Sequence, residues 1–578
     1  MSESLKNIRI NKIQDLERMK IEAYPYKFTT NTTIKQTRER YELDPKEISV
    51  GVIGKIKRIS NTDDGLMIRL EGNEKQITVY VNKEYAGEFT EKKSGDEIFI
   101  KGKVKRVNDN LSIEYDPTLE IPFQTSIESI VNMFDIEPSY EEISIAGRIV
   151  AIRDQGKAIF AHIRDIESKI QIYVKKDIVG EDKFKLFKDF VDVGDIVGVK
   201  GRIFRTKTGE LTVEVEHFEM LSKCLNELPE KWHGVKDPEV RYRQRYLDLI
   251  ANPEIGQIFT KRAKIINKIR EYFNSKGFYE VETPILSHIA SGASAKPFTT
   301  YHNALDQTLY LRIAPELFLK KLIVGGFTKV YEIGKNFRNE GIDTQHNPEF
   351  TMMEFYVAYW DYNDLMTFSE EFLSWLVAEI NGSHKVKFGE YEIDFTPPFR
   401  RIKYFDYLYE QTGKTKEFFL NEDNTRDFAR KLGIKEDKLT FPKVIDKIFS
   451  HFSEGKFINP TFVTDFPKIL SPLAKTHRSD PDLVERFELF AGGLEISNAY
   501  TELNDPIDQR KRFEEQLKQR ELGDEEAQMM DEDFITALEY GLPPTAGQGI
   551  GIDRLVMILT NSPSIREVII FPTLRQKQ

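Results

Sequence analysis

The carboxy-terminal half of the sequence contains a charged hairpin whose residue types suit a phosphorylated substrate. In KVYEIGKNFRNEGIDTQHNPEFTMMEFY, residues 329–356, two alternating runs flank a loop rich in Asn, Gly and Asp, which predicts an antiparallel hairpin with a long tip. Four residues of its second strand share one face, because strand side chains alternate: Phe350, Met352, Glu354 and Tyr356. Glutamate is almost never buried unless it is paired. Arg338 and His346, at the base and tip of the hairpin, are suited to contact a polyphosphate.

A second group of residues lies in RFELFAGGLEISNAYTEL, 486–503. Here an amide, an aromatic ring and a carboxylate share one strand face: Asn498, Tyr500 and Glu502. Glu488 and Glu495 lie on either side of its Gly-Gly turn. Two carboxylates beside a polyphosphate suit Mg²⁺, which takes a few protein oxygens and completes its shell with phosphates and water. The alternative interpretation is a solvated edge strand, which predicts no match to the face of the hairpin.

The third group is GLPPTAGQGIGIDRLVMILT, residues 541–560. A strand carrying Gly547, Gly549 and Gly551 runs into an apolar helix, with Arg554 in the first turn of that helix. The segment lacks the GK[ST] of a P-loop and the βαβ context of a Rossmann fingerprint. Glycine-rich turns are common, so this group identifies no ligand by itself.

The elements that precede these groups include an internal repeat. EISVGVIGKIKRI begins at Glu47 and its counterpart EIS at Glu142, while GDEIFIKGKVKR begins at Gly95 and GDIVGVKGRIFR at Gly194. Each copy predicts several short strands separated by turn signals. A unit of about 80 residues with that spacing suits a five-stranded OB-type barrel, a frequent carrier of single-stranded nucleic acid. A small barrel that only packs on its neighbour is the alternative.

The two copies differ at the positions where bases could be recognised. The second copy has a flat aromatic ring, an amide and a carboxylate: Phe160, Gln171 and Glu210. The first copy has Met67, Thr78 and Asn110 at the matching places. If one barrel reads bases, we expect it to be the second.

Composition and charge limit the remaining possibilities. The 578 residues carry 83 Lys and Arg against 94 Asp and Glu, a net charge of −11 that argues against a protein coating nucleic acid through bulk positive charge. The first forty residues are locally basic. This charge indicates either a solvated helix face or a contact surface for a partner. The single Cys224 excludes disulfides within the chain and multi-thiolate metal sites. No secretory signal or membrane span is predicted, so we expect a cytoplasmic protein.

The three groups of residues match, in order and spacing, the motifs of class II aminoacyl-tRNA synthetases. GFYEVETPIL with Pro284 resembles motif 1, FRNE and HNPEF resemble motif 2, and GIGIDR resembles motif 3. Within that class the chain is most similar to the lysyl enzymes, on RYRQRYLDLIANPE, LYLRIAPELFLKKLIVGGF, NPEFTMMEFY, SNAYTELNDPIDQR and GLPPTAGQGIGIDR. The resemblance covers residues 11–41 and everything from about residue 141 to the end.

This resemblance implies a multi-domain α+β protein with two tandem OB-type β-barrels, followed by a class II synthetase catalytic domain, an antiparallel sheet flanked by helices. The expected domains are a helical, basic extension (1–44), an extra barrel (45–122), a linker (123–140), an anticodon-binding OB-fold (141–225) and the catalytic domain (226–578). A polar helical subdomain is inserted at about 403–455. The extra barrel departs from the usual bacterial pattern.

The resemblance also implies a role for each matching residue. Arg338 and Arg554 are the implied catalytic residues, and Glu488 and Glu495 the Mg²⁺ ligands. ATP would be bound by Arg338, Glu340, His346, Asn347, Phe350, Glu488, Gly551 and Arg554. Lysine would be bound by Gly292, Ala293, Glu316, Glu354, Tyr356, Asn498, Tyr500 and Glu502. The anticodon would be read by Phe160, Gln171 and Glu210. Tyr500, where the family mostly has Phe, and Gln345, where Arg is frequent, are departures.

The implied activity is the ATP-dependent attachment of L-lysine to tRNA(Lys) through a lysyl-adenylate, by a homodimer that uses Mg²⁺. Two alternatives remain open at this point. A paralogue that charges another acceptor, such as a translation factor, would lack the barrels that this chain has. A non-catalytic tRNA-binding or regulatory protein would not need the full set of Arg338, Arg554, Glu488 and Glu495.

Overall fold

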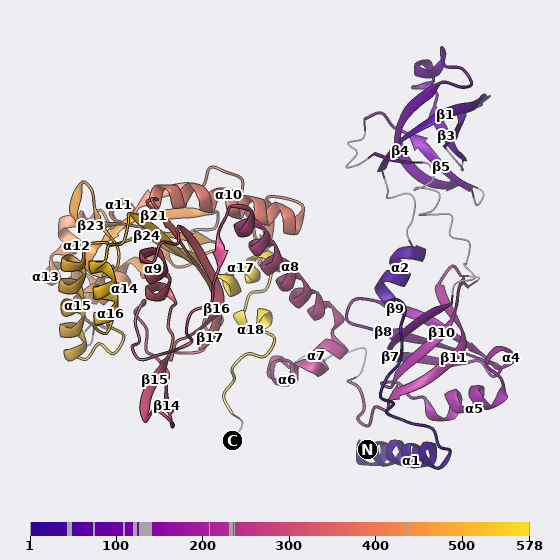
Figure 1. Cartoon of the computed structure of the whole chain (residues 1–578), viewed down its shortest axis with the longest axis horizontal. Coiled ribbons are helices and arrows are strands. Elements are labelled where there is room, and N and C mark those ends of the chain that lie inside the picture. Colours follow the sequence, from indigo (N-terminus) through magenta and orange to yellow (C-terminus); the bar gives the residue numbers. More distant parts are fainter. Residues whose placement is uncertain are drawn as a thin grey trace. The chain divides into compact units, whose positions relative to one another are not determined.

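The chain forms two compact units, Met1–Gly234 and Val235–Gln578, and each is considered by itself. A computed structural model describes residues 2–42, 49–72, 76–107, 110–118, 124–126, 142–206, 208–229, 235, 237–436 and 439–576 (Figure 1). Of the sequence-based assignments, residues 43–48 and most of the predicted linker lie outside this described part. None of the helices in these ranges has the length and apolar character that crossing a bilayer requires.

The first copy of the repeat folds into one curved sheet. Its strands are β1 (Ser49–Thr62), β2 (Gly65–Glu71), β3 (Gln76–Asn82), β4 (Glu97–Val107), β5 (Asn110–Tyr115) and β6 (Gln124–Ser126). The sheet order is β2-β3-β5-β4-β1-β6, and β2 also pairs with β1. A short 3-10 helix, η2 (Ala86–Phe89), precedes β4. Strand β6 lies within the range predicted as linker, so the sheet extends beyond residue 122.

The second copy is a closed five-stranded barrel. Its strands are β7 (Ile143–Asp154), β8 (Ala158–Arg164), β9 (Lys169–Lys175), β10 (Ile196–Arg205) and β11 (Leu211–Ser222), in the order β10-β11-β9-β8-β7. Two helices, α4 (Lys176–Val179) and α5 (Glu181–Phe190), lie between β9 and β10. Alternating residues of every strand, such as Ile159, Ala161 and Ile163, fill the barrel interior.

The basic amino-terminal segment packs on this second barrel. It forms α1 (Ser2–Arg18) and α2 (Ile34–Glu42). The Arg9 guanidinium donates to three backbone carbonyl groups between residues 193 and 226, and Lys12 pairs with Asp192 at 2.8 Å. Ile34 is fully buried in the barrel core. Part of the local positive charge therefore has a structural partner.

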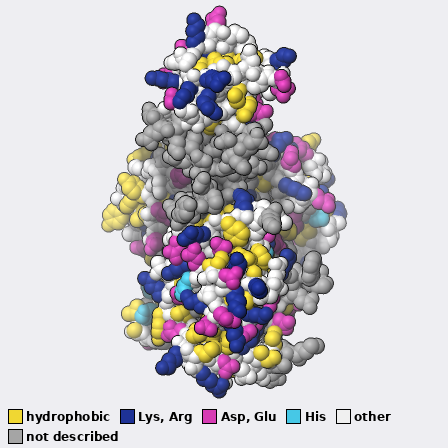
Figure 2. Space-filling view, turned by 90° about the vertical axis from the view of Figure 1, so that its right-hand side faces the viewer, with side chains coloured by type: hydrophobic (Ala, Val, Ile, Leu, Met, Phe, Trp, Pro, Cys, Tyr) yellow, Lys and Arg dark blue, Asp and Glu magenta, His cyan; other side chains and the backbone are white. Residues whose placement is uncertain are grey.

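Figure 2 shows Lys, Arg, Asp and Glu side chains interspersed over one face of the molecule.

The second unit is built around one large sheet. Its strands run in the order β12-β16-β17-β25-β24-β23-β21-β20, with β22 paired to β23. Their bounds are β12 (Tyr279–Glu280), β16 (Lys329–Phe337), β17 (Glu349–Ala358), β20 (Arg400–Lys403), β21 (Thr461–Pro467), β22 (Thr476–His477), β23 (Asp480–Ala491), β24 (Leu494–Thr501) and β25 (Thr545–Gly551). Pairing is antiparallel except at the outer pairs β12–β16 and β20–β21. The hairpin of β16 and β17 is confirmed, with Lys329 opposite Val357 and Phe337 opposite Glu349.

Helices cover both faces of this sheet (Figure 1). The helices of this unit outside residues 403–455 are α6 (Pro238–Arg243), α7 (Arg245–Ala251), α8 (Pro253–Ser275), α9 (Glu316–Val324), α10 (Tyr362–Asn381), α15 (Pro506–Glu521), α16 (Glu532–Glu539), α17 (Ile552–Leu559) and α18 (Ile565–Val568), and α6 and α7 lie beside the sheet and not on its faces. Helices α8, α10 and α17 pack on the Met353, Phe355 and Val357 side chains of β17, and this is the main core. The alternate residues of β17 therefore face the opposite side, towards α9.

Smaller elements complete the unit. Residues 403–455 contain α11 (Tyr404–Thr412), α12 (Lys416–Leu420), α13 (Glu422–Lys431) and α14 (Phe441–Ser453), which share a core with β21 and β23. A 3-10 helix, η3 (Lys468–Leu470), follows β21. A three-stranded sheet is formed by β13 (Leu286–Ser287), β14 (Thr299–His302) and β15 (Gln307–Leu311), and a hairpin by β18 (Lys385–Phe388) and β19 (Tyr391–Asp394).

Candidate active site

Three adjacent strands, β17, β25 and β24, bring the three groups of residues together. Pairing across the strands aligns Glu354 with Gly549 and Asn498 in one row, and Tyr356 with Gly547 and Tyr500 in the next. The two carboxylate- and amide-bearing strands thus flank a central strand without side chains at these positions. This arrangement confirms that the face predicted for the hairpin and the face predicted for residues 498–502 belong to one surface.

The glycines of β25 are required by the close approach of their neighbours. A Cβ atom on Gly547 would lie 2.2 Å from Glu502 Oε1 and 2.3 Å from Tyr356 Cε1, far inside van der Waals contact. On Gly549 it would lie 2.4 Å from Met352 Cε. Gly551 differs, because its nearest contact would be an ordinary 3.8 Å. The first two glycines therefore keep the groove between β17 and β24 open.

One end of this groove is a cavity of about 260 Å³. Among its lining residues are seven of those predicted to bind ATP: Arg338, Glu340, His346, Asn347, Phe350, Gly551 and Arg554. The Arg338 guanidinium lies 5.1 Å from the centre of the Phe350 ring, and burial lowers the pKa of this guanidinium. Arg338 Nε and Asn347 Oδ1 are buried without a hydrogen-bond partner. Both atoms are therefore available to a ligand.

Arg554 connects the glycine strand to the tip of the hairpin. Its guanidinium donates to the backbone carbonyl of Glu495 at 2.7 Å and to His346 Nε2 at 3.2 Å. His346 Nδ1 lies 2.8 Å from Asp343, whose pKa the combined hydrogen bonds hold below its usual range. These charged groups, together with a backbone hydrogen bond from Ile565 to Thr344 at 2.8 Å, hold the tip of the hairpin over the cavity.

The two residues predicted to bind metal are both held by arginines. Arg486 donates to Glu488 at 2.6 Å, and Arg554 lies 3.3 Å from Glu495. Burial and the nearby Glu495 carboxylate raise the pKa of Glu488, so a cation between the two would be stabilising. In the described part of the chain no group of three or more His, Cys, Asp or Glu residues could hold a metal. This donor set fits Mg²⁺ only together with substrate phosphates.

A larger cleft of about 480 Å³ adjoins the first cavity and shares Arg338 with it. Seven of the eight residues predicted to bind lysine line this cleft: Gly292, Ala293, Glu316, Glu354, Tyr356, Asn498 and Tyr500. Glu316 is the first residue of α9, and Gly292 faces it with a φ of 89°. The Tyr500 hydroxyl donates to the Glu316 carboxylate at 2.7 Å. The acidic and aromatic groups thus converge from a helix, a loop and two strands.

The eighth residue, Glu502, does not line the cleft. It lies 1% exposed behind Tyr356 and forms an ion pair with Lys320, a residue for which the sequence predicted no role. Lys320 is also fully buried and lies 2.6 Å from Glu316. Its spacing of four residues from Glu316 on one helix is a signal that could have identified the pair.

Glu354 is a buried carboxyl group that lines the cleft. Burial and the neighbouring Glu316 raise the pKa of Glu354 to about 8. Its only hydrogen-bond partner among the described residues is the Tyr356 hydroxyl, at 3.0 Å. A buried carboxyl group with so few partners is stabilised by a cationic ligand.

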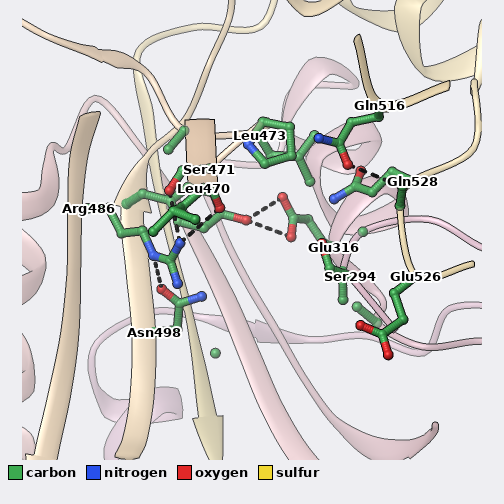
Figure 3. A pocket seen from close by; sticks show the side chains of 18 of the residues that line it. Ser294, Glu316, Leu470, Ser471, Leu473, Arg486, Asn498, Gln516, Glu526 and Gln528 are labelled. Carbon is green, nitrogen blue, oxygen red and sulfur yellow. Dashed lines mark hydrogen bonds between the residues drawn. The ribbon is translucent and has the colours of Figure 1, made fainter. Parts of the chain in front are cut away.

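The far side of the cleft is formed by elements that the sequence left without a function. Figure 3 shows Arg486 and Asn498, joined at 3.0 Å, on one side of the cleft, and Gln516, Gln528 and Glu526 on the other. Lys443 and Asp446 of α14 also line it. The inserted helices therefore contribute to the site, although their sequence predicted no chemistry.

In the second barrel the three predicted base readers lie on neighbouring strands or the adjoining turn, although Gln171 is only 7% exposed. Phe160 lies 4.7 Å from the Tyr173 ring, and Tyr173 lies 5.7 Å from Phe204, forming an aromatic row. Gln171 donates to Glu210 at 2.9 Å, and Glu210 also bonds His162 at 2.8 Å. Sequence reasoning missed Tyr173 and His162, which strand alternation places beside Gln171 and Phe160.

Comparisons with known proteins agree with this geometry. The family model described as tRNA synthetases class II (D, K and N) matches residues 237–575, and the OB-fold nucleic acid binding domain matches residues 143–221. The Lysine--tRNA ligase of Aquifex aeolicus is 56% identical over 577 residues, covering 99% of this chain and 96% of its own length. The chain belongs to the lysine–tRNA ligase family.

Other members of the lysine–tRNA ligase family share the chain less completely. The ligase of Halalkalibacterium halodurans is 52% identical over 444 residues, and that of Thermoanaerobacter pseudethanolicus is 53% identical over 449 residues. Each match covers 77% of this chain, with 88% and 90% of the respective relative. The match to the Aquifex ligase spans nearly every residue of this chain. It therefore includes strands β1–β6, the first copy of the repeat, which is called the first module below.

Proposed function

We propose that the cleft of the second unit performs both steps of lysine–tRNA ligation, and that the residues described above divide the work. The activity follows from family membership: ATP-dependent attachment of lysine to tRNA through an aminoacyl-adenylate. The observation that carries the division of roles is Arg338, which lines both the 260 Å³ cavity and the 480 Å³ cleft. The adenylate joins a nucleotide to an amino acid, so its phosphate belongs at such a junction.

In the first step, an oxygen of the lysine carboxylate attacks the α-phosphorus of ATP. A new P–O bond forms, the bond from the α-phosphorus to the bridging oxygen breaks, and pyrophosphate leaves. Arg338 and Arg554 are proposed as the catalytic residues, because their guanidinium groups offer paired donors to phosphate oxygens. Phe350 stacks on the adenine with Arg554 on its other face, while Glu340, His346, Asn347 and Gly551 complete the ATP site.

Lysine lies along the groove between β17 and β24. Glu316, with Gly292 and Ala293, receives the α-ammonium group. Glu354 with Tyr356 and Asn498 receives the ε-ammonium group, supported by Glu502 behind them, and the Tyr500 ring packs beside the methylene groups. Three buried carboxylates suit a cationic side chain, whereas an acidic amino acid would need a basic residue there.

Glu488 and Glu495 are proposed to hold Mg²⁺ together with the ATP phosphates. The ion supplies neutralisation of the phosphate charge that accumulates as pyrophosphate departs. The support for this assignment is the carboxylate pair itself, in which burial and the neighbouring Glu495 raise the pKa of Glu488.

In the second step, a ribose hydroxyl at the tRNA 3′ end attacks the lysyl carbonyl carbon, and AMP leaves. No protein nucleophile is required, so positioning supplies the rate. We assign the anticodon of tRNA(Lys) to the surface of Phe160, Gln171 and Glu210, where bases stack on the aromatic row and meet polar groups.

We further propose that the first module is an OB-type barrel that is accessory to the reaction. Its support is the pairing of the strands: β1 joins β2, β3, β5 and β4 in the same cycle that β7 makes with β8, β9, β11 and β10. A homodimer is supported by exposed apolar residues around the motif 1 segment, among them Tyr279, Leu286 and Phe327. A cytoplasmic location accords with the tRNA substrate.

The test of the proposed function is amino-acid-dependent ATP–pyrophosphate exchange with a panel of amino acids. Exchange with lysine and no other amino acid is expected. Exchange with a different amino acid would overturn the pocket assignment. If no exchange occurs either with or without tRNA, the proposed chemistry is wrong.

A further inference from the structure

A buried lysine lies directly behind the amino-acid pocket. Lys320 is on α9, one helical turn after Glu316, and its side chain is 0% exposed. Its Nζ lies 2.6 Å from Glu316 Oε1 and also contacts Glu502 Oε2. The rings of Tyr500 and Phe534 lie 5.5 Å and 5.7 Å from the ammonium group. Lys320 thus bridges two of the three carboxylates of the site.

Burying such an ammonium group is costly unless its partners offset the loss of hydration. Burial alone lowers the pKa of Lys320, but the attraction of Glu316 and Glu502 outweighs it, and the pKa stays above its usual value. Lys320 is therefore charged in the folded protein. Glu502 has no other ion-pair partner among the described residues, and burial raises its pKa well above the usual value even though Lys320 opposes this shift.

The charges around the pocket then have a definite balance. The carboxylates of Glu316, Glu354 and Glu502 face one cation, Lys320, so two negative charges remain when all are ionised. Free lysine carries two ammonium groups, and its carboxylate faces Arg338. The two negative charges that remain are therefore matched by the two positive charges of the ammonium groups.

We propose that Lys320 is a positioning and specificity-determining residue of the amino-acid site. It holds the Glu316 carboxylate in place for the α-ammonium group and offsets one of the three carboxylate charges around the pocket, so that the remaining charge is opposite and equal to that of the two ammonium groups of lysine. This inference rests on the proposed lysine site but assigns a role to a residue that does not contact the substrate.

The test compares Lys320→Met and Lys320→Gln with the wild type in lysine-dependent ATP–pyrophosphate exchange. Methionine keeps the length of the side chain without the charge, and glutamine keeps hydrogen-bond donors without the charge. Both are expected to raise the lysine KM by about tenfold or more, because a charged partner of Glu316 is lost. The ATP KM is expected to change by less than about twofold, since Lys320 does not line the ATP cavity.

Lys321→Met is the matched control. Lys321 is the next residue of the same helix and pairs with Asp533 at 2.6 Å, away from the cleft, so its loss removes an ion pair without altering the pocket. Its lysine KM is expected to match the wild type. Lys320→Arg, which keeps the charge, is expected to have a lower lysine KM than Lys320→Met.

Three outcomes would overturn the proposal. A folded Lys320→Met or Lys320→Gln variant with an unchanged lysine KM would show that the charge is not needed. Recovery in Lys320→Gln alone would assign Lys320 a hydrogen-bonding role only. Equal rises in the lysine and ATP KM values would indicate general destabilisation. Each result is distinguishable from failure of the proposed function, in which the wild type itself shows no lysine-dependent exchange.

Discussion

Glu354 illustrates how one residue combines burial with recognition. Its pKa of about 8 means that the unliganded protein holds a proton on this carboxyl group in many molecules at neutral pH. The ε-ammonium group of lysine is best received by the ionised form, so binding displaces that proton. Below the pKa of the free site, affinity therefore falls as the pH falls, by up to about tenfold per pH unit for one proton.

We predict that the lysine KM decreases between pH 6 and pH 8 and then levels off. The measurement is pyrophosphate exchange across this range, with the ATP KM followed in parallel. In Glu354→Gln the lysine KM should be higher, by the equivalent of roughly 1–3 kcal/mol, and should lose the part of the pH dependence that Glu354 causes. A wild-type lysine KM that is flat between pH 6 and pH 8 would contradict the assignment.

At the scale of the element, β25 determines the width of the groove. It lies between two strands that carry the polar side chains, and its own glycines leave the space that the substrate needs. The sequence pattern identified all three glycines of β25. The contacts show that a side chain is excluded at Gly547 and Gly549 but not at Gly551.

We predict that Gly547→Ala abolishes or severely weakens lysine binding. The new methyl group would meet Glu502 and Tyr356 at 2.2–2.3 Å, and overpacking of this kind costs about 1–3 kcal/mol even after neighbours shift. The lysine KM and the melting temperature report the two effects. Gly87→Ala in η2 is the control, since a Cβ there meets nothing within 4 Å, and it should leave both unchanged. Normal lysine binding by Gly547→Ala would mean that the groove is wider than the structure indicates.

At the scale of the whole molecule, the first module and the second barrel place different residues at matching positions. The strand register pairs Met67 with Tyr80 where the second barrel pairs Phe160 with Tyr173. At this point the second barrel has two aromatic rings in contact, beside the Gln171–Glu210 hydrogen bond, whereas the first module has one.

We predict that Phe160→Ala reduces lysylation of tRNA and leaves pyrophosphate exchange unchanged. Loss of one base–aromatic stack costs about 1–3 kcal/mol, which should appear in the tRNA KM. Met67→Ala, at the matching position of the first module, is the control and should change neither reaction. An equal loss of lysylation in both variants would assign tRNA recognition to the first module as well as to the second barrel.

Deletion of residues 45–126 tests the accessory role of the first module. The deletion includes β6, because this strand pairs with β1 and would otherwise be left without a partner. We expect lysine-dependent exchange to persist at near wild-type rates, since the second unit has its own core. Circular dichroism checks folding, and loss of exchange in a folded variant would show that the module supports catalysis.

The sequence by itself determined which side chains share a strand face and which motifs accompany one another. Phe350, Glu354 and Tyr356 point together because alternation is a local property of extended chain. Each family motif is a short contiguous segment, so it can be recognised in the sequence. The motifs therefore identified the fold, the activity and most of the ATP-site residues.

Contacts between elements that are distant in the chain became visible with the three-dimensional fold. The Tyr500 hydroxyl bonds Glu316 across 184 residues, and Lys320 meets Glu502 only when α9 packs beside the end of β24. No periodicity relates a helix to a strand so far away, because their meeting depends on how the intervening elements pack. The pairing of Lys320 with Glu502 was therefore beyond the reach of pattern, whereas seven of the eight residues expected to bind lysine do line the cleft.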